Sequence, residues 1–205
     1  MNIKTIPIMI LSLNVTTAVS MHYMHQDQKQ QLKIDAALIA TIEQKYHNPI
    51  TIDWLLSACN ADPNAKNTHG IPVLLLAIQQ EQLGTVQLLV TQKADINSQE
   101  STAPLMQSCY QGNQEITKTL LMAKANANIT TKYGHTALMD AALNGDISII
   151  VLLLEHGANP YAHNKERKTA YDFLTPEHEN TAAIIALLDQ YKIKTARTQN
   201  QELTV

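Results

Sequence analysis

The stretch from Gly134 to Asn159, GHTALMDAALNGDISIIVLLLEHGAN, decides how this chain is organised. Its ending, residues 157–159, has counterparts at three earlier places, around Ala61, Ala94 and Ala125. Together with Ala158, the four alanines are 33, 31 and 33 residues apart. A spacing of this size that returns in phase indicates an internal repeat.

Each repeat contains two helical segments. A leucine-rich segment comes directly before the ending of every repeat. In three repeats a shorter apolar segment with a Thr/Pro-type start comes before the leucine-rich segment. Such a unit has an apolar stripe that it cannot bury alone, so neighbouring units must stack into one continuous core with capped ends. The leucine-rich segments are 52–56, 85–90, 116–121 and 149–154, and the shorter ones start at 70–74, 103–106 and 134–139.

This organisation resembles the ankyrin repeat, because residues 134–159 follow the family pattern G-x-T-P-L-H-x-A-A-x-x-G almost position for position. The resemblance implies an all-α fold, an ankyrin-repeat solenoid of about five helix-turn-helix units with short hairpin loops, two of the units being end caps. It predicts helices in antiparallel pairs and no sheet beyond the hairpin tips. The units are expected at 32–64, 65–97, 98–128, 129–161 and 162–191.

The chain departs from the family pattern where its second helices end. The family closes this helix with glycine, whereas the chain has Asn60, Lys93 and Lys124, and only Gly157 is kept. A lysine with positive φ costs about 1 kcal/mol relative to glycine. Because residues 94–97 keep the rest of the family ending, we expect the backbone at Lys93 to stay left-handed.

The composition argues against several classes of protein. The chain has 205 residues with only 7 Tyr, 1 Trp, 1 Phe and 6 Gly, fewer than a β-sandwich or β-barrel usually needs. A net charge of -3 with scattered Lys and Arg disfavours a nucleic-acid partner. Cys59 and Cys109 are too few for a disulfide scaffold or a zinc site. No phased Ser/His/Asp set and no Gly-rich phosphate loop is present, so the sequence predicts no enzyme, cofactor or metal.

Residues 1–20 have the order of a secretory signal peptide. Lys4 precedes an apolar run at 6–15, and small or polar residues follow at 16–20. We therefore expect cleavage and a periplasmic or secreted protein, with an uncleaved anchor or a plain tail as the alternatives. Residues 21–31 are expected to form a polar spacer and residues 192–205 a polar tail.

Ankyrin-like stacks bind other proteins on a concave surface made by the hairpin tips and the exposed side of the first helices. The resemblance therefore implies a monomeric, non-catalytic scaffold that binds another protein, with no nucleic acid and no membrane contact beyond an uncleaved anchor. The alternatives are an ankyrin-type effector delivered to a host cell, a cytoplasmic regulator, and an enzyme or metal protein in an unusual stack. The positions carried over as protein-binding residues are Thr68, His69, Ile71, Gln79, Gln80, Tyr110, Gln111, Lys132, Tyr133, His135, Leu143 and Asn144.

Overall fold

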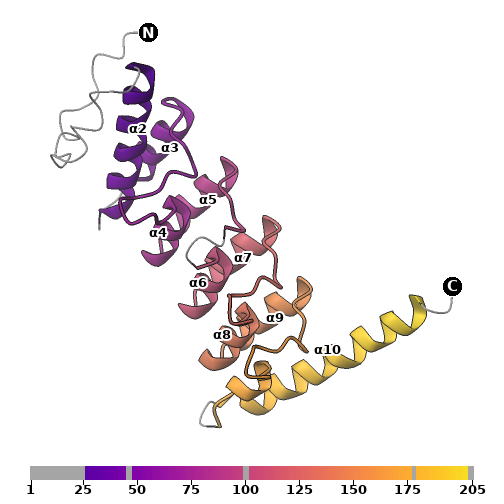
Figure 1. Cartoon of the computed structure of the whole chain (residues 1–205). Helices are drawn as coiled ribbons and strands as arrows, with labels where there is room; N and C mark the ends of the chain where they lie inside the picture. Colours follow the sequence, from indigo (N-terminus) through magenta and orange to yellow (C-terminus); the bar gives the residue numbers. More distant parts are fainter. Residues whose placement is uncertain (1–25, 45–47, 99–101, 177–178, 203–205) are drawn as a thin grey trace. The chain divides into compact units, whose positions relative to one another are not determined.

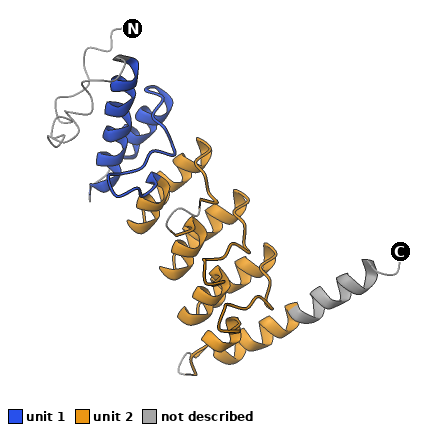
Figure 2. Ribbon diagram, viewed as in Figure 1, with its two compact units in different colours: residues 1–73 blue, residues 74–205 orange. Residues whose placement is uncertain are grey.

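The chain is built from short helices joined by tight turns. The computed structural model describes residues 26–44, 48–98, 102–176 and 179–202. Within these ranges it contains nine α-helices and one 3-10 helix, and the β-type pairings are isolated bridges from Lys66 to Pro72 and from Thr130 to Thr136. This confirms the predicted all-α fold (Figure 1). The chain divides into two compact units, residues 1–73 and residues 74–205 (Figure 2).

Unit 1, residues 1–73, contains α2 (Gln26–Glu43) and α3 (Pro49–Ser57), which pack against each other and are followed by a hairpin loop. Asn48 caps α3, because its side chain accepts a hydrogen bond from the N–H of Ile50 at 3.0 Å. Pro49 at the first helical position has no N–H to leave unsatisfied. The helices bury Leu38, Ile42, Ile52, Leu55 and Leu56.

Helix α2 begins inside the segment predicted as a polar spacer. Residues 21–31 are predicted to form a polar spacer, and α2 starts within them, at Gln26. Gln and Lys are good helix formers, and Asp27 in the first turn interacts favourably with the helix dipole. The side chain of Gln31 also donates a hydrogen bond to the carbonyl of Asn60 at 3.0 Å, so this segment belongs to the packed repeat. The predicted signal peptide lies outside the described residues.

Unit 2, residues 74–205, contains three consecutive helix pairs: α4 (Val73–Gln79, whose first residue ends unit 1) with α5 (Leu83–Thr91), α6 (Pro104–Tyr110) with α7 (Gln114–Met122), and α8 (Ala137–Asn144) with α9 (Ile147–Glu155). The first helices of the three pairs, α4, α6 and α8, form one row, in which α6 contacts α8. The second helices, α5, α7 and α9, form another row, in which α7 contacts α5 and α9. The core between these rows includes Leu105, Ile116, Leu120, Leu138, Ile149 and Leu153, each at most 2% exposed.

Residues with positive φ end the helices of each repeat. Lys93 and Lys124 have φ values of 64° and 71°, which confirms that lysine takes the conformation of the family's glycine at these positions. The first helices end in the same way, at Glu81, Gly112 and Gly145. The turn geometry is therefore kept even where the glycine is not.

The C-terminal end of unit 2 is a cap. It consists of η3 (Ala170–Phe173), which packs against α8, and α10 (Thr181–Glu202), which packs against α9 through the buried Ile184 and Leu188. Helix α10 continues to Glu202, although residues 192–205 are predicted to be a tail. The helix can continue because residues 181–202 contain neither Gly nor Pro. In the described part of the chain, no helix is long and apolar enough to cross a membrane.

Candidate functional site

The first helices of unit 2 present one repeated position to solvent at their C-terminal ends. Gln79, Tyr110 and Leu143 occupy this position in α4, α6 and α8, where each is followed after one residue by the left-handed turn. Tyr110 is 63% exposed and Leu143 is 42% exposed. Gln80, which directly follows α4, is also exposed. The row thus combines an aromatic and an aliphatic side chain from adjacent repeats.

Side-chain amides from the next repeat hold the backbone beneath this row. The Nε2 of Gln111 donates a hydrogen bond to the carbonyl of Gln79 at 3.1 Å. The Nδ2 of Asn144 donates to the carbonyls of Cys109 at 3.0 Å and Tyr110 at 2.9 Å. The nitrogens of these two predicted binding residues are therefore used within the stack, where Gln111 holds the backbone at Gln79 and Asn144 holds the backbone at Tyr110.

The hairpin before α8 carries two further predicted binding residues at its tip. Thr131 Oγ1 accepts hydrogen bonds from the N–H groups of Tyr133 and His135, both at 3.2 Å, and Gly134 supplies the positive φ of 76° that the tight turn needs. Tyr133 is 61% exposed, and Lys132 Nζ lies 5.1 Å from the centroid of its ring. Lys132 and Tyr133 thus form an exposed cation–π pair.

His135, at the base of the same hairpin, has its side chain engaged inside the protein. Its Nε2 lies 2.8 Å from Oδ1 of Asp140 on α8, and its ring packs edge-on against Phe173 with centroids 5.1 Å apart. The hydrogen bond to Asp140 raises the pKa of His135 above its ordinary value of 6.5. His135 therefore links the hairpin to α8 and η3, and we do not include it among the residues proposed to meet a partner.

The hairpin of unit 1 carries the remaining predicted residues. Asn67 Oδ1 accepts hydrogen bonds from the N–H groups of His69 and Ile71, both at 3.0 Å, around Gly70 with φ of 75°. Thr68 and His69 are exposed at the tip, whereas Ile71 is half-buried. The loop has the same construction as the hairpin at Tyr133.

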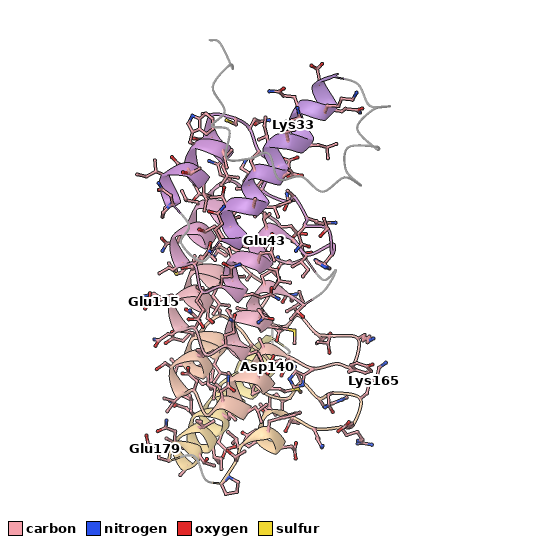
Figure 3. All side chains as sticks on the ribbon, turned by 90° about the vertical axis from the view of Figure 1, so that its left-hand side faces the viewer. Lys33, Glu43, Glu115, Asp140, Lys165 and Glu179 are labelled. Atoms are coloured by element: carbon pink, nitrogen blue, oxygen red, sulfur yellow. The ribbon has the colours of Figure 1, made fainter. Side chains whose placement is uncertain are left out.

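The predicted binding residues include none from the next hairpin of unit 2, residues 163–168, because the last repeat is expected to be an end cap. The N–H of Lys165 donates a hydrogen bond to the carbonyl of Tyr133 at 2.9 Å, which joins the two hairpins. Figure 3 shows the loop with Lys165 projecting from the helices, while Asp140 lies on the helix near its base. The signal that could have found this loop is its composition, Lys165-Glu166-Arg167-Lys168, the densest cluster of positive charge in the repeats.

A ladder of asparagines at the repeat endings was also missed. Asn97 Oδ1 accepts a hydrogen bond from the N–H of Asn126 at 2.8 Å, and Asn128 Oδ1 accepts one from the N–H of Asn159 at 2.7 Å. Asn128 Nδ2 also donates to the carbonyl of Gly157 at 2.8 Å. These hydrogen bonds join the ending of one repeat to the ending of the next, so the ladder stabilises the spacing of the repeats. Asparagine amides are not reactive groups, so the ladder has a structural role.

The thiols and histidines do not form a chemical site in the described ranges. Burial raises the pKa of the Cys109 thiol to about 12, so the thiolate is strongly disfavoured there. Among the described residues, no group of three or more His, Cys, Asp or Glu side chains could hold a metal ion.

Comparison with known proteins identifies the repeats. A family model for ankyrin repeats (3 copies) matches residues 37–132, 74–164 and 105–196. An ankyrin repeat-containing protein of Treponema pallidum is 34% identical over 103 residues, which cover 49% of this chain and 35% of that protein. The ankyrin repeat protein YahD of Escherichia coli is 33% identical over 101 residues, 48% of this chain and 50% of its own length. The ankyrin repeat and SAM domain-containing protein 6 of Rattus norvegicus is 44% identical over 77 residues, 36% of this chain and 9% of its own length.

The matched length decides what these similarities establish. The chain spans half or less of the length of each of these relatives, so what they share with it is the repeat region. Ankyrin repeats are generally not enzymes. Because the family model covers residues 37–196 in overlapping matches, the chain belongs to the ankyrin repeat family, whose repeats serve as scaffolds for protein–protein interaction.

Proposed function

We propose that the chain is a binding scaffold whose partner protein contacts the exposed ends of the first helices and the hairpin tips of unit 2. The observation that carries this proposal is the pair Tyr110 and Leu143, which are 63% and 42% exposed at the same position of adjacent repeats. Tyrosine is enriched at protein interfaces, where its large ring binds at little entropic cost.

The backbone beneath this pair supports the same interpretation. Asn144 holds the carbonyls of residues 109 and 110 with two hydrogen bonds, of 3.0 and 2.9 Å. A surface whose backbone is fixed before binding loses less conformational entropy when a partner docks. Tyr110 is therefore presented on a backbone that the next repeat holds in place, as an interface anchor should be.

Site-specific photo-crosslinking tests the proposal. The crosslinking amino acid p-benzoylphenylalanine is placed at Tyr110, at Leu143, or at Met122, which is 67% exposed but belongs to a second helix, α7. In the cells that make the protein, we expect positions 110 and 143 to capture the same partner and position 122 to capture none of it. Equal capture at the three positions, or no capture at 110 and 143, would reject this surface.

The export of the protein remains part of the proposal. Its support is the sequence order of residues 1–20, in which Lys4, an apolar run and small residues follow one another. We expect the mature protein to begin between residues 18 and 22, as measured by N-terminal sequencing from its final compartment. Recovery of protein that still begins with Met1 would contradict cleavage and favour the alternatives of an anchor, a cytoplasmic regulator or an effector delivered to a host.

A further inference from the structure

The two C-terminal hairpins of unit 2 are fixed against each other. The N–H of Lys165 donates to the carbonyl of Tyr133 at 2.9 Å. Gly134 lies so close to the next loop that an added Cβ would stand 3.1 Å from Cα of Asn164. Because backbone meets backbone here, the two loops hold their tips next to each other.

The tips carry positive charges that have no ion-pair partner. Lys132, Lys165 and Arg167 are exposed, and none of them forms an ion pair with another residue in the described ranges. Lys168, in contrast, is paired with Glu166, with Nζ and Oε2 3.0 Å apart. Three exposed cations thus lie on two adjoining hairpins in a chain whose net charge is -3.

The carboxylates near these tips are already engaged. Asp140 lies 2.8 Å from the ring of His135. Asp172 accepts hydrogen bonds from the N–H of Thr169 at 2.7 Å and from its hydroxyl at 2.9 Å, and these bonds lower the pKa of Asp172. Both carboxylates thus have other hydrogen-bond partners, and neither forms an ion pair with Lys132, Lys165 or Arg167.

We propose that these two hairpins form the docking site for an acidic, extended segment of the partner protein. The proposal rests on the proposed function and names the chemistry of that partner. Lys132 and Lys165 would meet single carboxylates, and the planar guanidinium of Arg167 can hold one with two parallel hydrogen bonds. The exposed ring of Tyr133 provides apolar contact for a side chain between the acidic residues. The charges come from two adjoining hairpins, Lys132 from one and Lys165 and Arg167 from the next, and an extended segment can reach both.

The phosphate backbone of a nucleic acid is the other anion that could bind these hairpins. The charge and the composition of the hairpin tips favour carboxylates over it. Nucleic-acid binding depends on many cations that neutralise successive phosphates, and here three are grouped on a chain of net charge -3. Proteins that bind single strands also need several exposed aromatic rings for base stacking. Tyr133 is the one Tyr, Trp or Phe of the two hairpin tips. An oligonucleotide therefore serves as a comparison in the test.

Fluorescence anisotropy with the full chain measures the binding directly. The probes are fluorescein-labelled peptides in which glutamate, glutamine or lysine alternates with leucine, and a single-stranded DNA oligonucleotide. We expect the glutamate peptide to bind, the glutamine and lysine peptides to bind at least about tenfold more weakly, and the affinity for the glutamate peptide to fall with added salt.

Variants assign the binding to the hairpin tips. The combined substitution Lys132→Gln, Lys165→Gln and Arg167→Asn removes three charges, with Asn chosen because it tolerates the positive φ of residue 167. We expect it to weaken binding of the glutamate peptide by about tenfold or more. Lys118→Gln, an exposed lysine on α7, is the matched control and should leave the affinity within about twofold. Circular dichroism melting confirms that each variant is folded.

Several outcomes would overturn the proposal. They are equal binding of the glutamate and glutamine peptides, equal loss in the Lys118 variant, tighter binding of the oligonucleotide, and no binding of the glutamate peptide at all. Crosslinking at Tyr110 and Leu143 does not depend on these charges. If crosslinking still captures a partner, only the acidic chemistry is wrong; if it also fails, the proposed function fails with it.

Discussion

Lys93 shows how a residue can keep a backbone conformation that suits it poorly. Its φ is 64°, and the turn around it is closed by hydrogen bonds from Lys93 N–H to Val90 and from Ala94 N–H to Leu89, both at 3.0 Å. A residue with a Cβ is strained in this region, whereas glycine is not. The neighbours that make these bonds thus impose the turn on the lysine.

Replacing Lys93 with glycine should therefore stabilise the protein. We expect Lys93→Gly to gain up to about 1 kcal/mol, less the entropy that glycine adds to the unfolded chain. Urea denaturation followed by circular dichroism measures the difference. Lys118→Gly is the control: in the middle of α7 it should lose about 0.5–1 kcal/mol. A clear loss at Lys93 would show that the left-handed turn is not strained there.

Thr85 is a polar residue at an otherwise apolar position. It is completely buried, and its hydroxyl has no hydrogen-bond partner in the described structure, whereas the equivalent residues of the next repeats are Ile116 and Ile149. We expect Thr85→Val to stabilise the protein by about 1 kcal/mol, because it removes an unsatisfied buried hydroxyl at nearly constant volume.

The matched control is Thr117→Val. The hydroxyl of Thr117 bonds to the carbonyl of Asn113 at 2.8 Å and lies 3.0 Å from Ser108 Oγ, so this substitution should destabilise the protein. The same chemical change is thus expected to act with opposite sign at two buried sites. Thermal or urea denaturation of both variants decides, and a common sign would contradict the hydrogen-bond assignment.

His135 should make stability depend on pH. The hydrogen bond to Asp140 raises its folded-state pKa above 6.5, so the folded protein holds the proton more tightly than the unfolded chain does. This contribution is complete below pH 6.5 and is lost as the pH rises through the folded-state pKa. Asp140→Asn removes the charge, so its cost should be larger at about pH 5.5 than at about pH 8.5, measured by urea denaturation. A cost that is independent of pH would contradict this coupling.

At the scale of the element, the sequence predicts best the features that depend only on residues within one repeat. The phase of Ala94, Ala125 and Ala158 places the buried leucines correctly, because an amphipathic helix pair has one apolar side whatever its neighbours are. The left-handed conformation of Lys93 and Lys124 is also predictable, because the residues that directly follow each lysine keep the ending of the family pattern. These features need no knowledge of residues far along the chain.

Contacts between repeats were not predictable in the same way. The family resemblance predicts Asn144 and Gln111 as partner-binding residues, but their amides bond to carbonyls 32 to 35 residues earlier. The hairpin at Lys165 was overlooked because its link to Tyr133 depends on how two loops meet in space. The neighbouring repeat decides whether a polar side chain bonds within the stack or is left to contact a partner. The sequence pattern of a single repeat does not contain that information.

The packing of the second helices gives a direct test of the repeat phase. Leu153 is completely buried in α9, whereas Gln79 is exposed at the end of α4. Leu153→Ala should cost about 2–5 kcal/mol through lost burial and the cavity left behind, and Gln79→Ala should change stability by less than about 0.5 kcal/mol. Melting temperatures of the two variants measure this, and equal values would contradict the assigned phase.

At the scale of the whole molecule, each compact unit contains one cysteine. Cys59 lies in unit 1 and is partly exposed, whereas Cys109 lies in unit 2 and is completely buried. Burial raises the pKa of both thiols, and that of Cys109 reaches about 12. Because the thiolate is the reacting form, Cys109 can be labelled only when α6 opens to solvent.

The rate of thiol labelling should therefore separate the two units. We expect the Cys109→Ala variant, which keeps Cys59, to react with an aromatic disulfide reagent in native buffer at least about a hundredfold faster than the Cys59→Ala variant, which keeps Cys109. In rising urea, labelling of Cys109 should accelerate in parallel with the loss of helical circular dichroism, since repeat stacks open by losing contacts between neighbours. Comparable rates in native buffer would mean that α6 is accessible in the folded state, and the fixed base proposed beneath Tyr110 would then be wrong.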